Sequence, residues 1–131
     1  MIDASATAVS WFLWVVSTVI LLVFALPLTV APFAWARVFR WQVDRESDLA
    51  LYLGRCLGVV ALTLVAAGYK AAPAPRDYPI VLEAYAVASF LLAGVHIWGA
   101  ITRRQPWTEN AETAAYLALG IAAAWLRASL P

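Results

Sequence analysis

Four long apolar stretches occupy most of this 131-residue chain and limit what it can fold into. They cover about residues 9–36, 49–69, 80–101 and 111–126. A helix needs roughly 20 apolar residues to cross the hydrocarbon core of a bilayer, and the first three stretches reach that length. The chain is 64% hydrophobic and 13% charged, whereas soluble domains are about half apolar and a quarter charged. The pattern therefore predicts an all-α protein that crosses a membrane several times.

We expect the chain to form a single membrane domain over residues 1–131, folded as an antiparallel bundle of four transmembrane helices. Pro27 and Pro32 interrupt the second half of the first stretch. Because proline removes a backbone donor, that end is expected to bend or to form a separate short helix. Ser47 or Asp48 is a suitable N-cap for the second helix.

The fourth stretch is short and rich in alanine, which makes it the weakest of the predicted spans. Thr108 with Glu109 and Glu112 nevertheless forms a good helix start, because a hydroxyl can cap the helix and acidic groups suit its N-terminus. Trp125 and Arg127 at the other end suit the opposite membrane interface. We therefore expect a crossing helix here too.

Basic residues predict the orientation of the spans. Loops that face the cytoplasm carry an excess of Lys and Arg. The first and third connections carry Arg37, Arg40, Arg45, Arg103 and Arg104, whereas the other side carries Lys70, Arg76 and Arg127. This distribution predicts a multi-pass protein of the cell membrane, with the 1–2 and 3–4 loops in the cytoplasm and both termini outside. Because the N-terminus has no Lys or Arg, we expect a retained first span and not a cleaved leader.

Small residues indicate where helices approach each other in lipid. Gly54 and Gly58 form a GxxxG pair in the second stretch, and Ala118 and Ala122 share one face of the fourth. The GxxxG pair has two interpretations, which are packing within the chain and homodimerisation. Packing within the chain is the one we favour.

Ionisable side chains inside a span are costly and therefore mark candidate functional sites. Arg55 and His96 lie at a common depth, on the order of 10 Å from the cytoplasmic boundary. Tyr52 lies one turn from Arg55, and Tyr116 lies at a similar depth. Together these four residues could bind an anionic headgroup or a small carboxylate. In the alternative interpretation Arg55 reaches the interface, and a backbone carbonyl or a neighbouring tyrosine satisfies His96.

Glu83 is the third ionisable residue within a span. It lies one turn inside the outer end of the third stretch, where we expect it to pair with Lys70 or Arg76. A role in proton relay is the alternative.

Several kinds of chemistry find no support in the sequence. One histidine and one cysteine form neither a disulfide, nor a bis-histidine haem site, nor a cluster of zinc ligands. A nucleophilic pair of Cys56 and His96 would lie in hydrocarbon without water. There is no hydrolase, P-loop or zinc-protease motif, and no basic block typical of nucleic-acid binding. We expect no catalytic residues, metal or cofactor.

The segment Arg55-Cys56-Leu57-Gly58, followed by Leu92-Ala93-Gly94-Val95-His96, resembles the small four-span scaffold family of sterol C4-demethylation complexes. The similarity covers about residues 49–101. The chain lacks the acidic residue expected after the histidine and has an Arg- and Trp-containing 3–4 loop instead. The resemblance implies a non-catalytic membrane tether that holds lipid-modifying enzymes together.

The sequence thus predicts a small integral membrane protein that acts as a non-catalytic accessory or scaffold subunit. Its expected partners are the lipid bilayer and other membrane proteins or a second copy. The alternative is binding or transport of a lipid-like or amphipathic anion at the Arg55/His96 cluster, as a homodimer. An enzyme, such as a lipid isomerase or a reductase accessory, is a third possibility.

Overall fold

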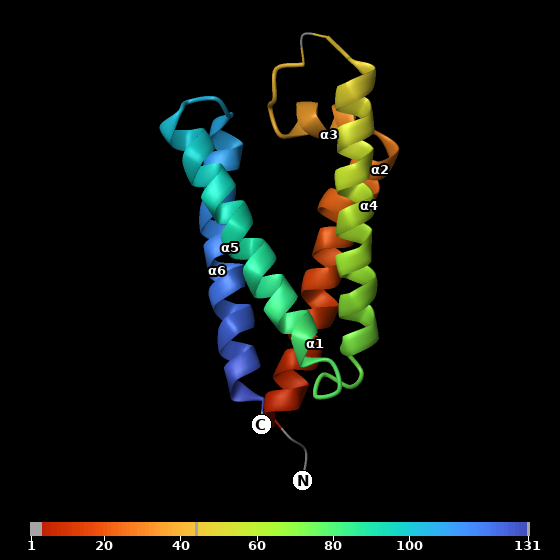
Figure 1. Cartoon of the computed structure of the whole chain (residues 1–131), viewed down its shortest axis with the longest axis vertical. Coiled ribbons are helices and arrows are strands. Elements are labelled where there is room, and N and C mark those ends of the chain that lie inside the picture. The colour runs from red at the N-terminus through yellow and green to blue at the C-terminus, as the bar shows by residue number, and fades with distance from the viewer. Residues whose placement is uncertain (1–3, 44, 131) are drawn as a thin grey trace.

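The computed structural model describes residues 4–43 and 45–130, and its regular structure is helical (Figure 1). This confirms the all-α prediction. The elements in chain order are α1 (Ala4–Ile20), the π-helical turn η1 (Leu21–Ala25), α2 (Leu26–Val30), α3 (Pro32–Val38), α4 (Asp48–Ala71), α5 (Pro79–Ile101) and α6 (Trp107–Ser129).

Within the described residues, three helical segments are long and apolar enough to cross a membrane, namely Ser5–Val30, Asp48–Ala71 and Pro79–Ile101. They correspond to the first three predicted spans. The fourth is not among them, although α6 extends over 23 residues. Two glutamates near its start, an arginine near its end and an alanine-rich middle make it less apolar than the others. The structure therefore has three candidate membrane-spanning helices in its described part, and the bundle of four spans stays a prediction.

The first span breaks where the prolines predict. Pro27 has no N–H to donate to the carbonyl of Val23 four residues earlier, and the helix widens into η1 just before it. The indole Nε1 of Trp35 instead donates to Val23 O at 2.8 Å. At Ala31 the backbone leaves the helix (φ −141°, ψ 66°), and Pro32 starts the separate short helix α3. The Trp35 hydrogen bond holds α3 against the helix that precedes it.

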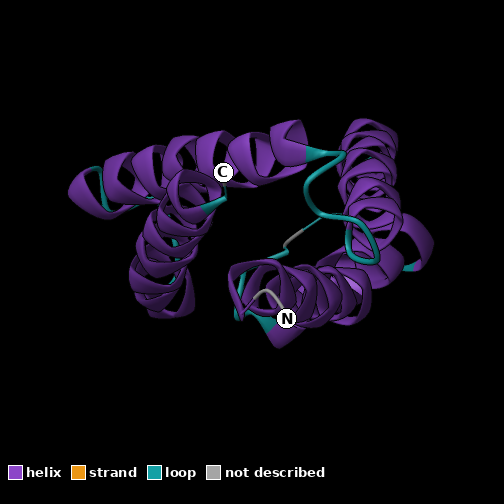
Figure 2. Ribbon diagram, turned by 90° about the horizontal axis from the view of Figure 1, so that it is seen from below, coloured by secondary structure: helices purple, strands orange, loops and turns teal. Residues whose placement is uncertain are grey.

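The helices form two pairs that meet at one end of the molecule. α4 packs on α1, η1 and α2, and α5 packs along α6, whereas contacts between the pairs are few. Figure 1 shows the pairs converging near the two termini and diverging toward the loops, and Figure 2 shows α5 leaning away from α4. We call the end with the termini the closed end and the other the open end.

A buried core fills the closed end, with side chains from both pairs. Tyr85 of α5 is at its centre, and its hydroxyl donates to Leu64 O of α4 at 3.1 Å. Because a phenol has one proton to donate, Ser17 of α1 donates to Tyr85 Oη at 2.9 Å. Such bonds between helices add to close packing in lipid, where apolar burial contributes little. The apolar members of this core are Val9, Leu13, Ala71, Ala72, Val81, Leu82, Tyr85, Ala86, Ala123, Leu126 and Leu130.

The GxxxG glycines of α4 face the broken first span of the same chain. A Cβ on Gly54 would lie 2.6 Å from Pro32 Cβ, and one on Gly58 would collide with Thr29 and Ala25 O. These contacts support packing within the chain as the role of the motif. On α6 the alanines do not lie as predicted, since Ala118 is exposed and Ala122 is half-buried.

The small residues of α6 that pack are one step further round the helix. A Cβ on Gly120 would press on the ring of Phe90 in α5, and Ala123 is fully buried in the core. The buried face of α6 is therefore set by the spacing of Gly120, Ala123 and Leu126.

The predicted N-cap is present at the start of α4 but not at the start of α6. Ser47 Oγ accepts a hydrogen bond from Ala50 N at 3.2 Å, as predicted for an N-cap of α4. Thr108 does not cap α6, because the helix begins at Trp107 after Pro106, and Thr108 Oγ1 donates to Phe39 O at 2.5 Å. Pro106 takes the N-cap position and has no side-chain oxygen, so the helix starts without a side-chain cap.

The GxxxG packing can be tested by adding one methyl group at Gly58. We expect Gly58→Ala to lower the free energy of unfolding by about 1–3 kcal/mol, because the methyl group overlaps Thr29 and the Ala25 carbonyl. Gly94→Ala is the matched control, since a Cβ there meets nothing within 4 Å. Unfolding in mixed micelles, followed by circular dichroism, measures both. Equal stability of the two variants would contradict the packing.

Candidate functional site

The cluster that could carry chemistry lies at the open end, between the last turns of α5 and the first turns of α6. These helices are antiparallel and joined by a short turn, so the end of one faces the start of the other. Glu109, Glu112 and Tyr116 are spaced by three and four residues, which places them on one face of α6. His96 of α5 projects toward that face.

The hydrogen bonds of His96 fix which ring nitrogen carries a proton. His96 Nδ1 lies 2.8 Å from Leu92 O, and a carbonyl oxygen can only accept, so Nδ1 is the donor. Nε2 then points at Glu109 Oε2 at 2.9 Å and Glu112 Oε2 at 3.7 Å. Gln105 Nε2 donates to His96 O at 2.9 Å and fixes the backbone here. The ring is thus oriented from one side and offers its other nitrogen to two carboxylates.

Glu109 is the most buried charged residue of the cluster, with 5% of its surface exposed. Its Oε1 accepts a hydrogen bond from Trp41 Nε1 at 2.8 Å, and its Oε2 faces His96. Trp41 belongs to the loop after α3, so this carboxylate joins the two helix pairs. A buried carboxylate needs such partners, because its desolvation is otherwise costly.

Glu112 and Tyr116 complete the cluster. Glu112 Oε1 is buried and has no hydrogen-bond partner among the described residues. The ring of Tyr116 lies against the imidazole of His96, with centroids 4.9 Å apart. In the described part of the chain, the only ion-pair partner of either glutamate is His96.

Three consecutive residues after α3 contact three consecutive residues at the start of α6, and we call these contacts the clasp. Thr108 Oγ1 donates to Phe39 O, Arg40 lies 5.6 Å above the ring of Trp107, and Trp41 donates to Glu109. Arg40 has a positive φ of 65°, which turns the chain out of α3 toward α6. The clasp connects the two helix pairs at the open end.

The structure brings together only half of the predicted anion site. His96 and Tyr116 are in contact, but Tyr52 is 64% exposed and Arg55 is exposed on α4. α4 and α5 diverge toward this end, so their similar depth does not make them neighbours (Figure 1). No contact of Arg55 or Tyr52 with His96 is present among the described residues.

Glu83 pairs with a residue that the sequence did not suggest. Its Oε1 accepts from Arg127 Nε of α6 at 2.7 Å, and the predicted partner Lys70 instead lies 5.2 Å from the centre of the Tyr78 ring. Glu83 is thus in a surface ion pair, as predicted in kind, and the partner shown is Arg127 because α6 lies along α5.

The sequence prediction missed two residues of this cluster, Glu109 and Glu112. It treats them only as part of a helix start and not as ligands. The exclusion of metals counts histidine and cysteine and leaves out carboxylates. Yet one ligand atom from each of His96, Glu109 and Glu112 can be chosen so that all lie within 4.8 Å of one another. The signal in the sequence is a pair of glutamates three residues apart, following a short turn after the chain's single histidine.

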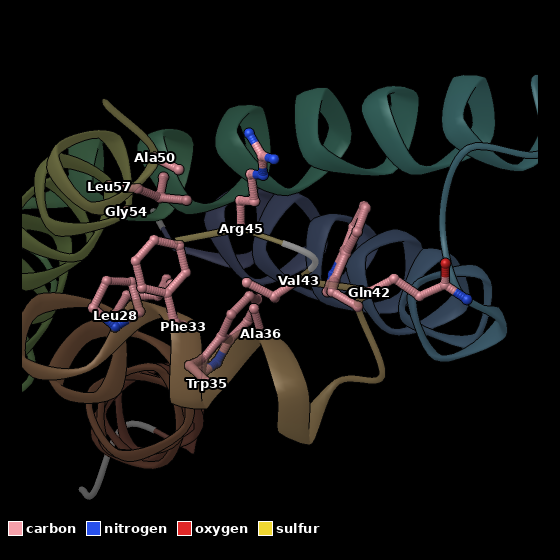
Figure 3. Close-up of a pocket in the computed structure, with 12 residues that line it drawn as sticks. Leu28, Phe33, Trp35, Ala36, Gln42, Val43, Arg45, Ala50, Gly54 and Leu57 are labelled. Atoms are coloured by element: carbon pink, nitrogen blue, oxygen red, sulfur yellow. The ribbon is translucent and has the colours of Figure 1, made fainter. Parts of the chain in front are cut away.

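A separate hollow lies on the first helix pair at the open end (Figure 3). Its volume is about 530 Å³. In Figure 3 the Arg45 side chain turns away from the rings of Phe33 and Trp35. The walls come from α2, α3, α4 and the loop between α3 and α4, including Leu28, Pro32, Phe33, Trp35, Trp41, Arg45, Gly54 and Leu57.

No protein-family model matches the chain, and no curated protein or solved structure shows similarity to it. The resemblance to the sterol C4-demethylation scaffold family therefore stays a prediction.

The hydrogen bond between Trp41 and Glu109 can be tested by removing its donor. We expect Trp41→Phe to lower the free energy of unfolding by about 1–3 kcal/mol, because a buried carboxylate oxygen loses its partner. Trp98→Phe is the control, since Trp98 is exposed on α5. Unfolding of each variant in mixed micelles gives the values. If the two variants lose the same stability, the bond is not the connection described here.

Proposed function

We propose that the protein is a small multi-pass membrane protein that acts as a non-catalytic accessory subunit. In this proposal an apolar helix of a partner membrane protein packs on apolar side chains that the two helix pairs expose toward the open end. α6 crosses the bilayer beside α5, and the arginine-rich loops face the cytoplasm.

The exposed apolar side chains of the two helix pairs support this proposal. The buried core that joins the pairs lies at the closed end, and the clasp joins them at the loops. Toward the open end, large apolar side chains such as Leu57 of α4 and Val95 of α5 are exposed. Helices in lipid associate through close packing, so a partner helix gains contacts with both pairs at once.

A crosslinking experiment tests the accessory role. A photoreactive residue in place of Leu57 is expected to link to one partner membrane protein, and mild detergent is expected to retain a complex of the same two proteins. The same residue in place of Ile121, which is exposed on α6, serves as the control. A stable lone monomer without crosslinks from position 57 would contradict the proposal, and crosslinks between two copies would indicate a homodimer instead.

The hollow beside Arg45 favours a second candidate function, which is binding of an amphipathic anion. Its apolar walls suit an acyl chain, and a guanidinium at its edge can donate two hydrogen bonds to a phosphate or carboxylate. The site differs from the predicted Arg55/His96 cluster, but the ligand class is the same.

Native mass spectrometry of bound lipid tests this second candidate. We expect Arg45→Leu to reduce retention of an anionic phospholipid about three- to tenfold, because an exposed charge-assisted hydrogen bond is lost. Arg104→Leu removes an exposed arginine from the 3–4 loop and is the control. Equal retention by the two variants would remove the site.

A further inference from the structure

We propose that His96, Glu109 and Glu112 bind one divalent transition-metal ion of the zinc class at the open end of the α5–α6 pair. The inference is independent of the accessory role and of the Arg45 hollow. It is based on the direction of a ring nitrogen, on an unpartnered oxygen and on the balance of charge.

The first observation is the direction of the imidazole lone pair. Because Nδ1 donates to Leu92 O, Nε2 of a neutral ring carries a lone pair and no proton. Nε2 lies 2.9 Å from Glu109 Oε2 and 3.7 Å from Glu112 Oε2, so a proton on Nε2 or a metal ion can join these atoms. A metal-ligating histidine usually donates its other ring N–H to a carbonyl or carboxylate in this way, which orients the ring toward the metal.

The second observation is the presence of two carboxylates where an ion pair would need one. A protonated His96 would carry one positive charge against two carboxylates, so one negative charge in the cluster would stay uncompensated. Glu112 Oε1 is buried without a hydrogen-bond partner among the described residues. Neutral imidazole, two carboxylates and one divalent cation sum to zero charge, which avoids the cost of burying an unpaired ion.

The third observation is the spacing of the donor atoms. Zinc binds nitrogen and oxygen at about 2.0–2.2 Å, so ligand atoms around one such ion are about 2.9–3.5 Å apart. The distances from Nε2 to the two carboxylates, 2.9 and 3.7 Å, bracket this range. The three ligand atoms lie within 4.8 Å of one another, so small side-chain movements bring them round one ion.

The donor set indicates the class of metal. Mg²⁺ and Ca²⁺ prefer ligands that are all oxygen, whereas imidazole with carboxylates suits Zn²⁺, Fe²⁺ or Mn²⁺. Three protein ligands leave at least one coordination position for water or another ligand. Trp41 donates to the outer oxygen of Glu109, so an ion here would also stabilise the clasp.

The test uses the full chain in detergent after treatment with a chelator. Zn²⁺ titrated by calorimetry is expected to bind one ion per chain with a micromolar or lower Kd, and Co²⁺ is expected to give a visible absorption band. Glu112→Gln keeps the shape of the side chain and is expected to weaken binding at least tenfold. Trp41→Phe removes the outer hydrogen bond and is expected to weaken it about tenfold or more.

Glu83→Gln is the matched control, because Glu83 pairs with Arg127 at the other end of α5 and should leave binding unchanged. Circular dichroism shows whether each variant is folded, and Zn²⁺ should raise the melting temperature of the unaltered chain but not of Glu112→Gln. Absence of micromolar binding by the folded chain would overturn the proposal and leave an ion pair only. Binding that Glu112→Gln and Glu109→Gln leave equally strong would also overturn it.

Discussion

One buried carboxylate, that of Glu109, holds the open end of the molecule together. One of its oxygens accepts from the indole of Trp41, and the other faces His96, so it contacts both helix pairs at once. In an apolar surrounding such a group is stable only where each oxygen has a partner. The position of the α3–α4 loop, the orientation of His96 and the proposed metal ligands therefore depend on the same side chain.

A second constraint acts on the backbone of the first span. Hydrocarbon offers no water, so a carbonyl that loses its helical donor needs another one from the protein. Pro27 creates this need at Val23, and Trp35 meets it by folding α3 back on the span. The same fold places Phe33, Trp35 and Ala36 around the hollow beside Arg45. A single proline thus determines where the apolar walls of that hollow lie.

The break in the first span and the cap at Ser47 could be predicted from the local sequence, but lateral neighbours could not. The common depth of Arg55 and His96 stays a prediction. Whether two residues at one depth meet depends on which helix faces pack, and in lipid most faces are equally apolar. This is why Arg55 lies apart from His96, why Glu83 pairs with Arg127, and why Glu109 and not Arg55 completes the polar cluster.

The buried core at the closed end acts as a pivot, about which the two helix pairs can tilt relative to each other. Sixteen residues separate Tyr85, where α5 meets α1 and α4, from Ile101 at its far end, so that end lies about 24 Å from the contact. A tilt of about 10° at that pivot displaces the far end by about 4 Å, nearly half the separation of two packed helices. The clasp restrains this tilt at the far end of the helices. Its few hydrogen bonds therefore control a movement that the buried core alone would not prevent.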